Sequence, residues 1–298
     1  GAALMDLGEG NPDVVVLDAD LGNSTMSRQF QDKYPQRYFE MGIAEADMTS
    51  TAAGLAASGK IPFTNSFAVF SGGRAFDQIR QTIAIGKLNV KICGSSAGLS
   101  DFGDGATHQS VEDMAIMRAI PNMTVLSPAD GNETYKVVKA MAAMDGPCYI
   151  RVNRNDYDNV TAEDAPFVIG QPTVLREGKD VTVFATGYMV SLALQAAEQV
   201  EDKADVKVVN VSTLKPLNNE AIRQLAAGSR GVVTAEEHSV IGGLGGAVAQ
   251  ALAPAPIPMS FVGIEDCFGC SAHSYGELLE HFGLTARNIA EEILKFVD

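Results

Sequence analysis

Short apolar runs that alternate with helix-forming segments constrain this chain more than any other feature of its sequence. The first run, Val14–Leu17, ends at Asp18-Ala19-Asp20. An unbroken stretch of valine and leucine is typical of a strand buried on both faces, as strands of parallel sheets are. Ligands bind beyond the carboxyl ends of such strands. The run therefore predicts a buried parallel strand that delivers acidic side chains to a binding edge.

The same alternation continues along the chain and predicts an α/β fold. Asp130 precedes a helical segment as a candidate N-cap. After the first strand, the elements that we expect are helix Met48–Ala57, strand Lys60–Phe63, helix Arg74–Gly86, strand Val90–Cys93, helix Val111–Arg118, strand Thr124–Leu126, helix Gly131–Met144 and strand Cys148–Val152. Beyond them we expect strand Val181–Phe184, helix Val190–Val200, strand Val206–Val211, helix Asn219–Ala227, strand Gly231–Ala235, an element at Ala247–Leu252, strand Met259–Gly263 and helices Ser274–Phe282 and Thr285–Phe296.

A change in composition divides the chain into two domains. From Asn153 to Gly178, Asn, Asp, Pro and Gly replace the apolar runs and no regular period remains. We therefore predict a doubly wound parallel-sheet domain at residues 1–160, a linker at 161–178 and a smaller α/β domain at 179–298. A length of 298 residues suits two domains that each bury a core.

Charge and cysteine content exclude several classes of function. The net charge of −15 disfavours nucleic acid or an anionic membrane as a partner, because both would repel the average surface. Without an apolar run long enough to cross a bilayer and without a secretory signal pattern, the chain is expected to be cytoplasmic. The four cysteines are too scattered for a disulfide framework, and the pair Cys267 and Cys270 lacks a second pair to complete a zinc site. We therefore expect no metal site in this chain.

One carboxylate and two aromatic side chains suggest a site for a flat ring. Glu45 stands between a strand end and an alanine-rich helix, and Phe67 and Phe70 follow it. A carboxyl group can exchange a proton with a ring nitrogen, while aromatic side chains offer faces for stacking. The alternative is that Glu45 only favours the helix macrodipole and that the phenylalanines belong to the core.

Several motifs in order resemble the transketolase family, in particular its pyrimidine-binding and C-terminal domains. The resemblance covers nearly the whole chain. The motifs that carry it are Asp18–Leu21 with Ser24, Met41–Glu45 with Met48, Ser66–Phe70, Arg74–Gln78, Gly103–Gln109, Pro121–Met123, Arg154, Phe268-Gly269 and Glu277–Leu279.

The resemblance implies a divided enzyme. Full-length transketolases begin with a domain that holds the diphosphate and a divalent metal, and this sequence starts within the pyrimidine-binding half. The chain thus looks like the C-terminal subunit of a split transketolase. The implied cofactor is thiamine diphosphate, shared with an N-terminal partner subunit that binds Mg²⁺ or Ca²⁺. The implied assembly is a heterotetramer with two copies of each chain, acting on sugars or sugar phosphates.

The resemblance also implies roles for particular residues near the cofactor. Glu45 matches the glutamate that bonds the aminopyrimidine ring and acts in catalysis. Phe67 and Phe70 match residues that pack against that ring, and Asp20 matches an acidic residue near the centre of the cofactor. The segment Ser71–Gly73 is one residue longer than the usual pattern and lacks its third aromatic.

On the substrate side, Asp104 matches a residue that binds a sugar hydroxyl, and His108 a catalytic residue near the donor carbonyl. Ser24 and Arg154 match positions that hold the sugar phosphate. Arg154 could instead pair with Asp156 or Asp158 as a surface ion pair. The family often has a further histidine before this loop, and Gly94–Gly98 contains none, so the terminal group of the substrate could be something other than phosphate.

Two kinds of alternative function remain at this point. Deoxyxylulose phosphate synthases and beta subunits of pyruvate dehydrogenase use the same cofactor on other donors. A noncatalytic scaffold or nucleotide-binding subunit is the other class, because Gly242–Gly246 imitates a dinucleotide fingerprint. Close helix–sheet packing explains these glycines better, and Glu236, Glu237 and His238 beside them are expected to line a domain or subunit interface.

Overall fold

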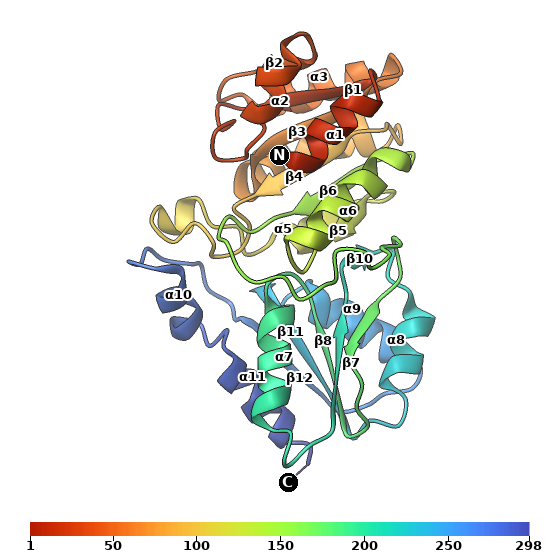
Figure 1. Cartoon of the computed structure of the whole chain (residues 1–298), viewed down its shortest axis with the longest axis vertical. Coiled ribbons are helices and arrows are strands. Elements are labelled where there is room, and N and C mark those ends of the chain that lie inside the picture. The colour runs from red at the N-terminus through yellow and green to blue at the C-terminus, as the bar shows by residue number, and fades with distance from the viewer. Residues whose placement is uncertain (298) are drawn as a thin grey trace.

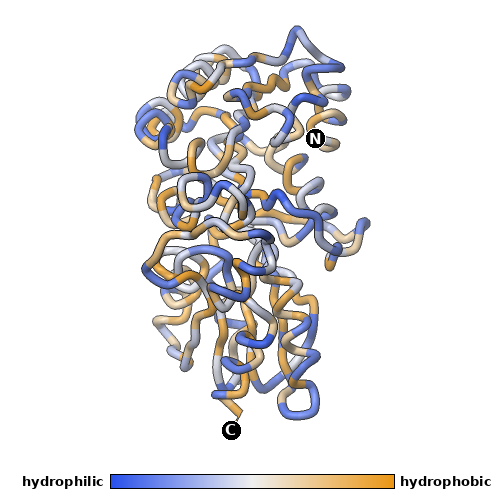
Figure 2. The backbone as a smooth tube through the Cα atoms, turned by 90° about the vertical axis from the view of Figure 1, so that its left-hand side faces the viewer, coloured by the Kyte–Doolittle hydropathy of each residue, from blue (hydrophilic) through white to orange (hydrophobic). Residues whose placement is uncertain are grey.

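Two α/β lobes stack along the long axis of the molecule, with the N-terminus in one and the C-terminus at the far end of the other (Figure 1). The computed structural model describes residues 1–297. Apolar segments run through the interior of both lobes, and hydrophilic segments lie mostly in the peripheral loops (Figure 2). Within residues 1–297, none of the helices combines the length and the apolar character needed to cross a membrane.

The first lobe contains a seven-stranded sheet covered by helices. Its strands are β1 (Val14–Asp18), β2 (Tyr38–Glu40), β3 (Ile61–Phe67), β4 (Lys91–Ser95), β5 (Thr124–Leu126), β6 (Cys148–Arg151) and β10 (Thr213–Lys215), in the order β10-β5-β6-β4-β3-β1-β2. Its helices are α1 (Ala2–Gly10), α2 (Arg28–Lys33), α3 (Glu45–Ala57), α4 (Phe76–Gln78), α5 (Asp113–Ala119) and α6 (Gly131–Ala143). The strands other than β10 pair in parallel, and β10 pairs antiparallel with β5.

The second lobe contains a five-stranded sheet. Its strands are β7 (Thr173–Arg176), β8 (Val181–Ala185), β9 (Val206–Asn210), β11 (Gly231–Ser239) and β12 (Met259–Ile264), in the order β12-β11-β8-β9-β7. Its helices are α7 (Met189–Gln199), α8 (Asn219–Ala226), α9 (Leu244–Leu252), α10 (Tyr275–His281) and α11 (Ala286–Leu294). The predicted class, two α/β domains built on mainly parallel sheets, is confirmed.

Local sequence signals located most elements correctly. Every residue of β1 is buried, and the strand pairs in parallel with β2 and β3, as a run apolar on both faces requires. The Asp130 side chain caps α6 by accepting the Glu133 backbone N–H at 2.8 Å. The main strands of both sheets therefore begin and end within a few residues of their predicted bounds.

The predicted domain and linker boundaries differ from the structure in two places. Residues 173–176, inside the predicted linker 161–178, form β7 and pair antiparallel with β9. Residues 213–215, inside the predicted second domain, form β10 and extend the sheet of the first lobe. Both strands are short edge strands whose pairing partners are distant in sequence. They are too short for a local hydrophobic period to predict them.

The predicted helix Arg74–Gly86 is also interrupted. Residues 69–74 and 79–84 form wider π-helical turns on either side of the single turn α4. π-Helical turns inside α-helices are frequent at functional sites. The first helix of the chain, α1, was not predicted. It buries Ala3, Leu4 and Gly8, which gives it only a short apolar stripe.

A buried arginine joins the two lobes. Arg151 at the end of β6 donates from Nε to the Asp113 carboxylate at 2.9 Å and from both Nη atoms to the Glu237 backbone oxygen at 3.2 Å. Tyr149 donates its hydroxyl to the same Asp113 oxygen at 2.8 Å. Asp113 and Arg151 belong to the first lobe and Glu237 to the second. A buried guanidinium is costly without its partners. The two lobes are therefore held in the orientation in which Arg151 reaches both Asp113 and the Glu237 backbone.

Glu237 and His238, two of the three residues predicted at a domain or subunit interface, contact the first lobe. The Glu237 carboxylate accepts the Leu99 backbone N–H at 2.7 Å and the Asn153 side-chain amide at 3.2 Å. His238 accepts the Ala115 N–H at 3.3 Å. Burial raises the pKa of Glu237 to about 7.

Replacing Arg151 with leucine is expected to destabilise the fold by about 3–5 kcal/mol, because Asp113 then loses its buried countercharge. Urea unfolding measures this loss. Arg287→Ala is the control, since Arg287 pairs with Glu291 with both side chains mostly exposed, and a surface pair contributes less than about 1 kcal/mol. Equal losses in the two variants would contradict the role of Arg151.

Glu237 predicts a specific pH dependence. Because its pKa is raised from 4.5 to about 7, the folded chain binds more protons than the unfolded chain in that interval, and this group's contribution to stability is lost as the pH rises through it. Glu237→Gln keeps the acceptor for Leu99 and removes the titration. The stability of the variant relative to the wild type should therefore rise from acidic to neutral pH in urea unfolding. Parallel pH profiles of the two proteins would show that Glu237 does not titrate there.

Candidate active site

The Glu45 carboxylate is buried at the start of α3, with its side chain 1% exposed. Gly42, two residues before the helix cap, has a φ of +68°, which lets the chain turn from the strand end into the helix. Both carboxylate oxygens accept from Nη1 of Arg74, at 3.0 and 2.9 Å. The Arg74 side chain is 50% exposed, so the carboxylate lies just beneath the surface with one half-exposed partner over it.

Two phenylalanines form a wall beside this carboxylate. Phe67 ends β3, and Phe70 lies in the π-helical turn at 69–74 that follows. Their rings are nearly parallel, with centroids 6.2 Å apart at 14°. The His108 ring approaches both rings edge-on, 5.3 Å from Phe70 and 6.3 Å from Phe67. The sequence-predicted residues Glu45, Phe67, Phe70 and His108 therefore lie in one site.

Arg154 extends the site on the other side of the wall. Its guanidinium carbon lies 5.7 Å from the centroid of Phe67, and Nη1 donates to Oδ2 of Asp101 at 2.7 Å. Asp101 is 4% exposed at the side chain and Arg154 37%. The partner of Arg154 is therefore Asp101, and neither Asp156 nor Asp158, which the sequence had offered as surface partners, forms this ion pair.

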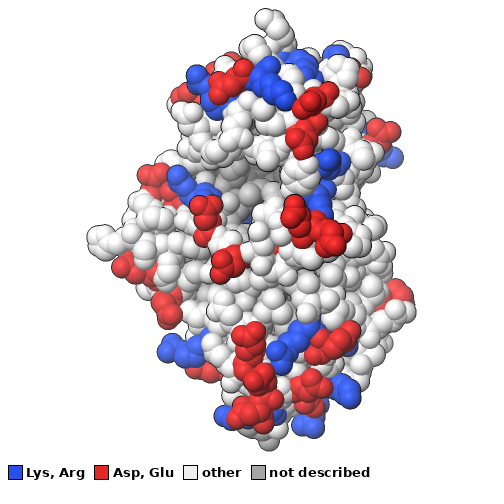
Figure 3. Space-filling view, in the orientation of Figure 1, with Lys and Arg blue, Asp and Glu red and all other residues white. Residues whose placement is uncertain are grey.

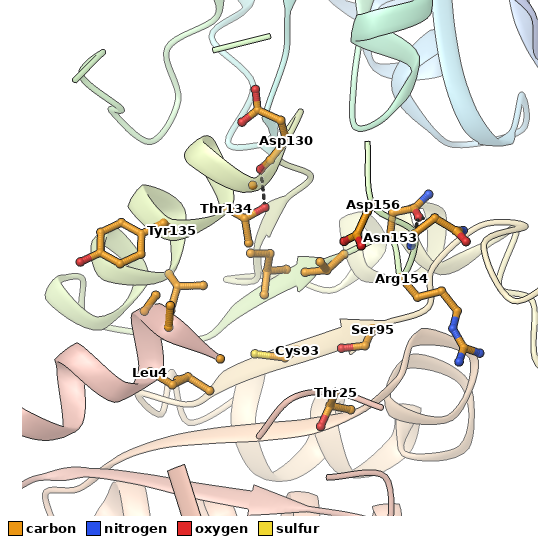
Figure 4. A pocket seen from close by; sticks show the side chains of 18 of the residues that line it. Leu4, Thr25, Cys93, Ser95, Asp130, Thr134, Tyr135, Asn153, Arg154 and Asp156 are labelled. Atoms are coloured by element: carbon orange, nitrogen blue, oxygen red, sulfur yellow. Dashed lines mark hydrogen bonds between the residues drawn. The ribbon is translucent and has the colours of Figure 1, made fainter. Parts of the chain in front are cut away.

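Arg154 also borders a cavity of about 500 Å³. Figure 4 shows Asn153, Arg154 and Asp156 on one side of it, Thr25 and Ser95 beneath, and Tyr135 on the opposite side. These residues come from the end of β4, from the loops after β1 and β6 and from α6. The cavity therefore opens at the carboxyl edge of the first sheet, where an α/β fold places its ligands.

Asp20 and Ser24 lie on the loop after β1, at a separate hollow of about 200 Å³. Asp20 has a φ of +62°, and its N–H donates to the Glu40 carboxylate at 2.9 Å. Ser24 is exposed. Thr25, next along the loop, lines the larger cavity as well, so the loop borders both spaces without placing Asp20 or Ser24 against the phenylalanine wall.

Asp104 is exposed at the N-terminus of the short turn Gly105–Thr107, one turn before His108. The loop that carries both is held by the second lobe. Gln109 donates to the backbone oxygens of Asp101 and Cys270, each at 3.0 Å, and the Leu99 N–H donates to Glu237. The domain interface thus sets the position of this loop.

Three carboxylates shape the site beyond the predicted residues: Glu40 and Asp101 were not predicted, and Asp18 was predicted only as an acidic residue at a strand end. Asp18 is fully buried and accepts from Leu21 N, Thr25 Oγ1 and Ser27 Oγ, which fixes the loop after β1, and burial raises its pKa. Glu40 accepts the N–H groups of Asp20 and Gly42 and so joins two strand ends. Asp101 neutralises Arg154. Asp18 and Glu40 are the last residues of β1 and β2, and Asp101 lies in the loop after β4, so an acidic residue at or after a strand end was the available signal.

The arrangement around Glu45 fits a flat nitrogen heterocycle. The Arg74 guanidinium is planar, carries N–H donors, lies 4.7 Å from the Phe70 centroid and bonds both Glu45 oxygens. A ring with the same shape and donors can make the same contacts. Among the described residues, three or more His, Cys, Asp or Glu side chains nowhere gather in a way that could hold a metal ion.

The glycine run has a structural explanation. Gly243 and Gly245 stand at the start of α9, where the Glu236 carboxylate accepts the N–H groups of Leu244 and Gly245 at 2.6 and 2.8 Å. A side chain at Gly243 would collide with Glu236, and one at Gly245 with Phe261. Because a carboxylate of the chain itself fills the anion position at this helix end, the run does not form a pyrophosphate site.

Known proteins match this chain along nearly its whole length. The transketolase pyrimidine-binding domain matches residues 1–159 and the transketolase C-terminal domain residues 170–289. A 6-deoxy-6-sulfo-D-fructose transketolase subunit of Clostridium sp. (strain MSTE9) is 43% identical over 96% of this chain and 89% of its own length. One of the subunits of an apulose-4-phosphate transketolase, from Phocaeicola vulgatus, is 36% identical over 99% of this chain and 95% of its own length.

A solved structure of a split gene transketolase, an inactive beta4 tetramer, superposes with a TM-score of 0.90 at 46% identity, covering 99% of this chain and 95% of that one. By contrast, this chain covers only 47% of human transketolase, at 36% identity. Both domains match, the chain spans nearly the full length of proteins that are separate transketolase subunits, and the superposition covers almost the whole chain. The chain belongs to the transketolase family, and its two domains correspond to the C-terminal subunit of a split transketolase.

Proposed function

We propose that this chain is the C-terminal subunit of a thiamine diphosphate-dependent transketolase that moves a two-carbon ketol unit from a ketose to an aldose. The observation that carries the proposal is the buried Glu45 carboxylate beside the parallel rings of Phe67 and Phe70. This pair of features suits the aminopyrimidine end of the cofactor. Thiamine diphosphate, when bound, supplies the carbon nucleophile that breaks and remakes the bond next to a carbonyl.

In this proposal Glu45 accepts a hydrogen bond from the pyrimidine ring and holds a proton at the ring nitrogen. Arg74 occupies the same oxygens in the structure, so its half-exposed side chain gives way when the ring enters. Phe67 and Phe70 pack against the ring and keep water from it. Asp20 is assigned to the cofactor side as well, on the loop after β1.

His108 is assigned to the substrate carbonyl and hydroxyl groups, where an imidazole can donate or accept a proton. Its ring meets the phenylalanine wall edge-on, which places it next to the proposed cofactor position. Asp104 and Ser24 are exposed side chains on the two loops beside it and are assigned to substrate hydroxyl groups. Arg154 is assigned to the far end of the substrate.

A partner subunit completes the proposed site. Ile43, two residues before Glu45, is 75% exposed, and Phe268, beside the His108 loop, is 78% exposed. We propose that an N-terminal subunit covers them and supplies the diphosphate and the Mg²⁺ or Ca²⁺ ion, in a heterotetramer with two copies of each chain. The beta4 relative, which is inactive, supports the need for a partner.

The test is reconstitution. The purified chain, its N-terminal partner, thiamine diphosphate and magnesium should together transfer a ketol unit, and neither chain should do so alone. Release of carbon dioxide from pyruvate without ketol transfer would instead favour a deoxyxylulose phosphate synthase-like or 2-oxoacid dehydrogenase-like activity.

Glu45→Gln is expected to reduce kcat of the heteromer by about 10²-fold or more, because the amide cannot exchange the proton that the carboxyl group exchanges. Calorimetric titration with thiamine diphosphate should also show weaker binding. Asp47→Asn is the matched control, since Asp47 is an exposed acid in the first turn of the same helix. Similar losses in both variants would mean that Glu45 acts only on the helix macrodipole.

His108→Asn is expected to lower kcat/KM by about 10²-fold or more while leaving thiamine diphosphate binding unchanged, because the imidazole acts on the substrate. Steady-state kinetics with varied donor, together with cofactor titration, measures the two effects separately. His281→Asn, an exposed histidine at the end of α10, serves as the control. Full activity of His108→Asn would remove His108 from the site.

A further inference from the structure

The charges around Arg154 are unusual for a position that binds phosphate. Arg154 is the one lysine or arginine among the described residues that line the 500 Å³ cavity. Its guanidinium is engaged by Asp101 at 2.7 Å, and two further carboxylates, those of Asp130 and Asp156, line the cavity itself (Figure 4). The one cationic side chain that lines this cavity among the described residues is therefore already paired with a carboxylate, and the other charged side chains that line it are acidic.

Burial strengthens this pairing. Asp101 is 4% exposed at the side chain, and Arg154 is the one charged donor to its carboxylate among the described residues. A buried carboxylate needs its countercharge, so Arg154 is not free to leave it. A phosphate at Arg154 would approach the Asp101 carboxylate as well, and two like charges in a partly desolvated site repel strongly. On the face of the molecule that Figure 3 shows, acidic and basic side chains are interspersed.

The neutral groups of the cavity suit a hydroxylated end instead. Ser95, Thr134, Asn155 and Asn159 line it and offer hydroxyl and amide groups. An arginine that shares its charge with Asp101 still has N–H donors for a hydroxyl oxygen. Hydrogen bonding of this kind does not require a charge on the ligand.

We propose that Asp101 makes the end-group site selective for ketoses whose last carbon carries a neutral hydroxyl, and against those with a phosphate dianion. The inference rests on the proposed transketolase function and on the assignment of Arg154 to the far end of the substrate. This selectivity sets the chain apart from relatives named for a sulfonated and a phosphorylated sugar. Asp101 acts through Arg154 and is a positioning residue.

The first test compares fructose with fructose 6-phosphate as donors for the reconstituted heteromer. The wild type should have the higher kcat/KM for fructose. Asp101→Asn, which keeps the shape of the side chain, should shift the ratio toward fructose 6-phosphate by about tenfold or more, mainly through KM. Asp202→Asn, at an exposed turn of the second lobe, controls for the loss of one negative charge. A wild-type preference for the phosphate, or an unchanged ratio in Asp101→Asn, overturns the proposal.

The second test does not depend on turnover, so failure of the proposed function and failure of this inference can be told apart. Calorimetry of the heteromer with millimolar inorganic phosphate should show no binding to the wild type, measurable binding to Asp101→Asn, and none to the double variant Asp101→Asn, Arg154→Gln. Phosphate binding to the wild type as tight as to Asp101→Asn would show that Asp101 only anchors its loop.

Discussion

The rest of the molecule depends on the hydrogen bonds of the buried Arg151 guanidinium. It joins Asp113 of the first lobe to the Glu237 backbone of the second, and neither charged group can lose its partner without leaving an unpaired charge inside the protein. Glu237 in turn holds Leu99, and Gln109 holds Cys270. Because the loop at 97–109 carries Asp101, Asp104 and His108, the second lobe shapes a site that the first lobe contains.

The site itself is built from two carboxylate–arginine pairs on either side of one aromatic wall. Glu45 with Arg74 lies beside Phe70, and Asp101 with Arg154 lies beside Phe67. In each pair the carboxylate is buried and the arginine is partly exposed. Each buried carboxylate is paired with one arginine in this arrangement. In the proposed function Arg74 gives way to the cofactor ring, whereas Arg154 stays with Asp101 and offers its remaining N–H donors to the sugar.

Sequence patterns predicted those parts of the fold whose signals are local. The apolar run of β1 and the Asp130 cap of α6 were confirmed because each depends on residues next to one another in sequence. β7 and β10 were missed because their strand character comes from partners in distant segments. For the site, Glu45, Phe67, Phe70, His108 and Arg154 were named in advance and lie together. Asp101 was not, because its role depends on a residue more than fifty positions away.

The sequence by itself determined the fold class, the succession of the main strands along the chain and the family. Apolar periods, caps and motifs are all encoded in neighbouring residues. Only the tertiary structure decided which carboxylate pairs with which arginine, and how the second lobe holds the loop with His108. Those outcomes depend on how buried charges are compensated across the domain interface. Charge compensation of this kind involves residues that only folding brings together, so no local sequence pattern predicts it.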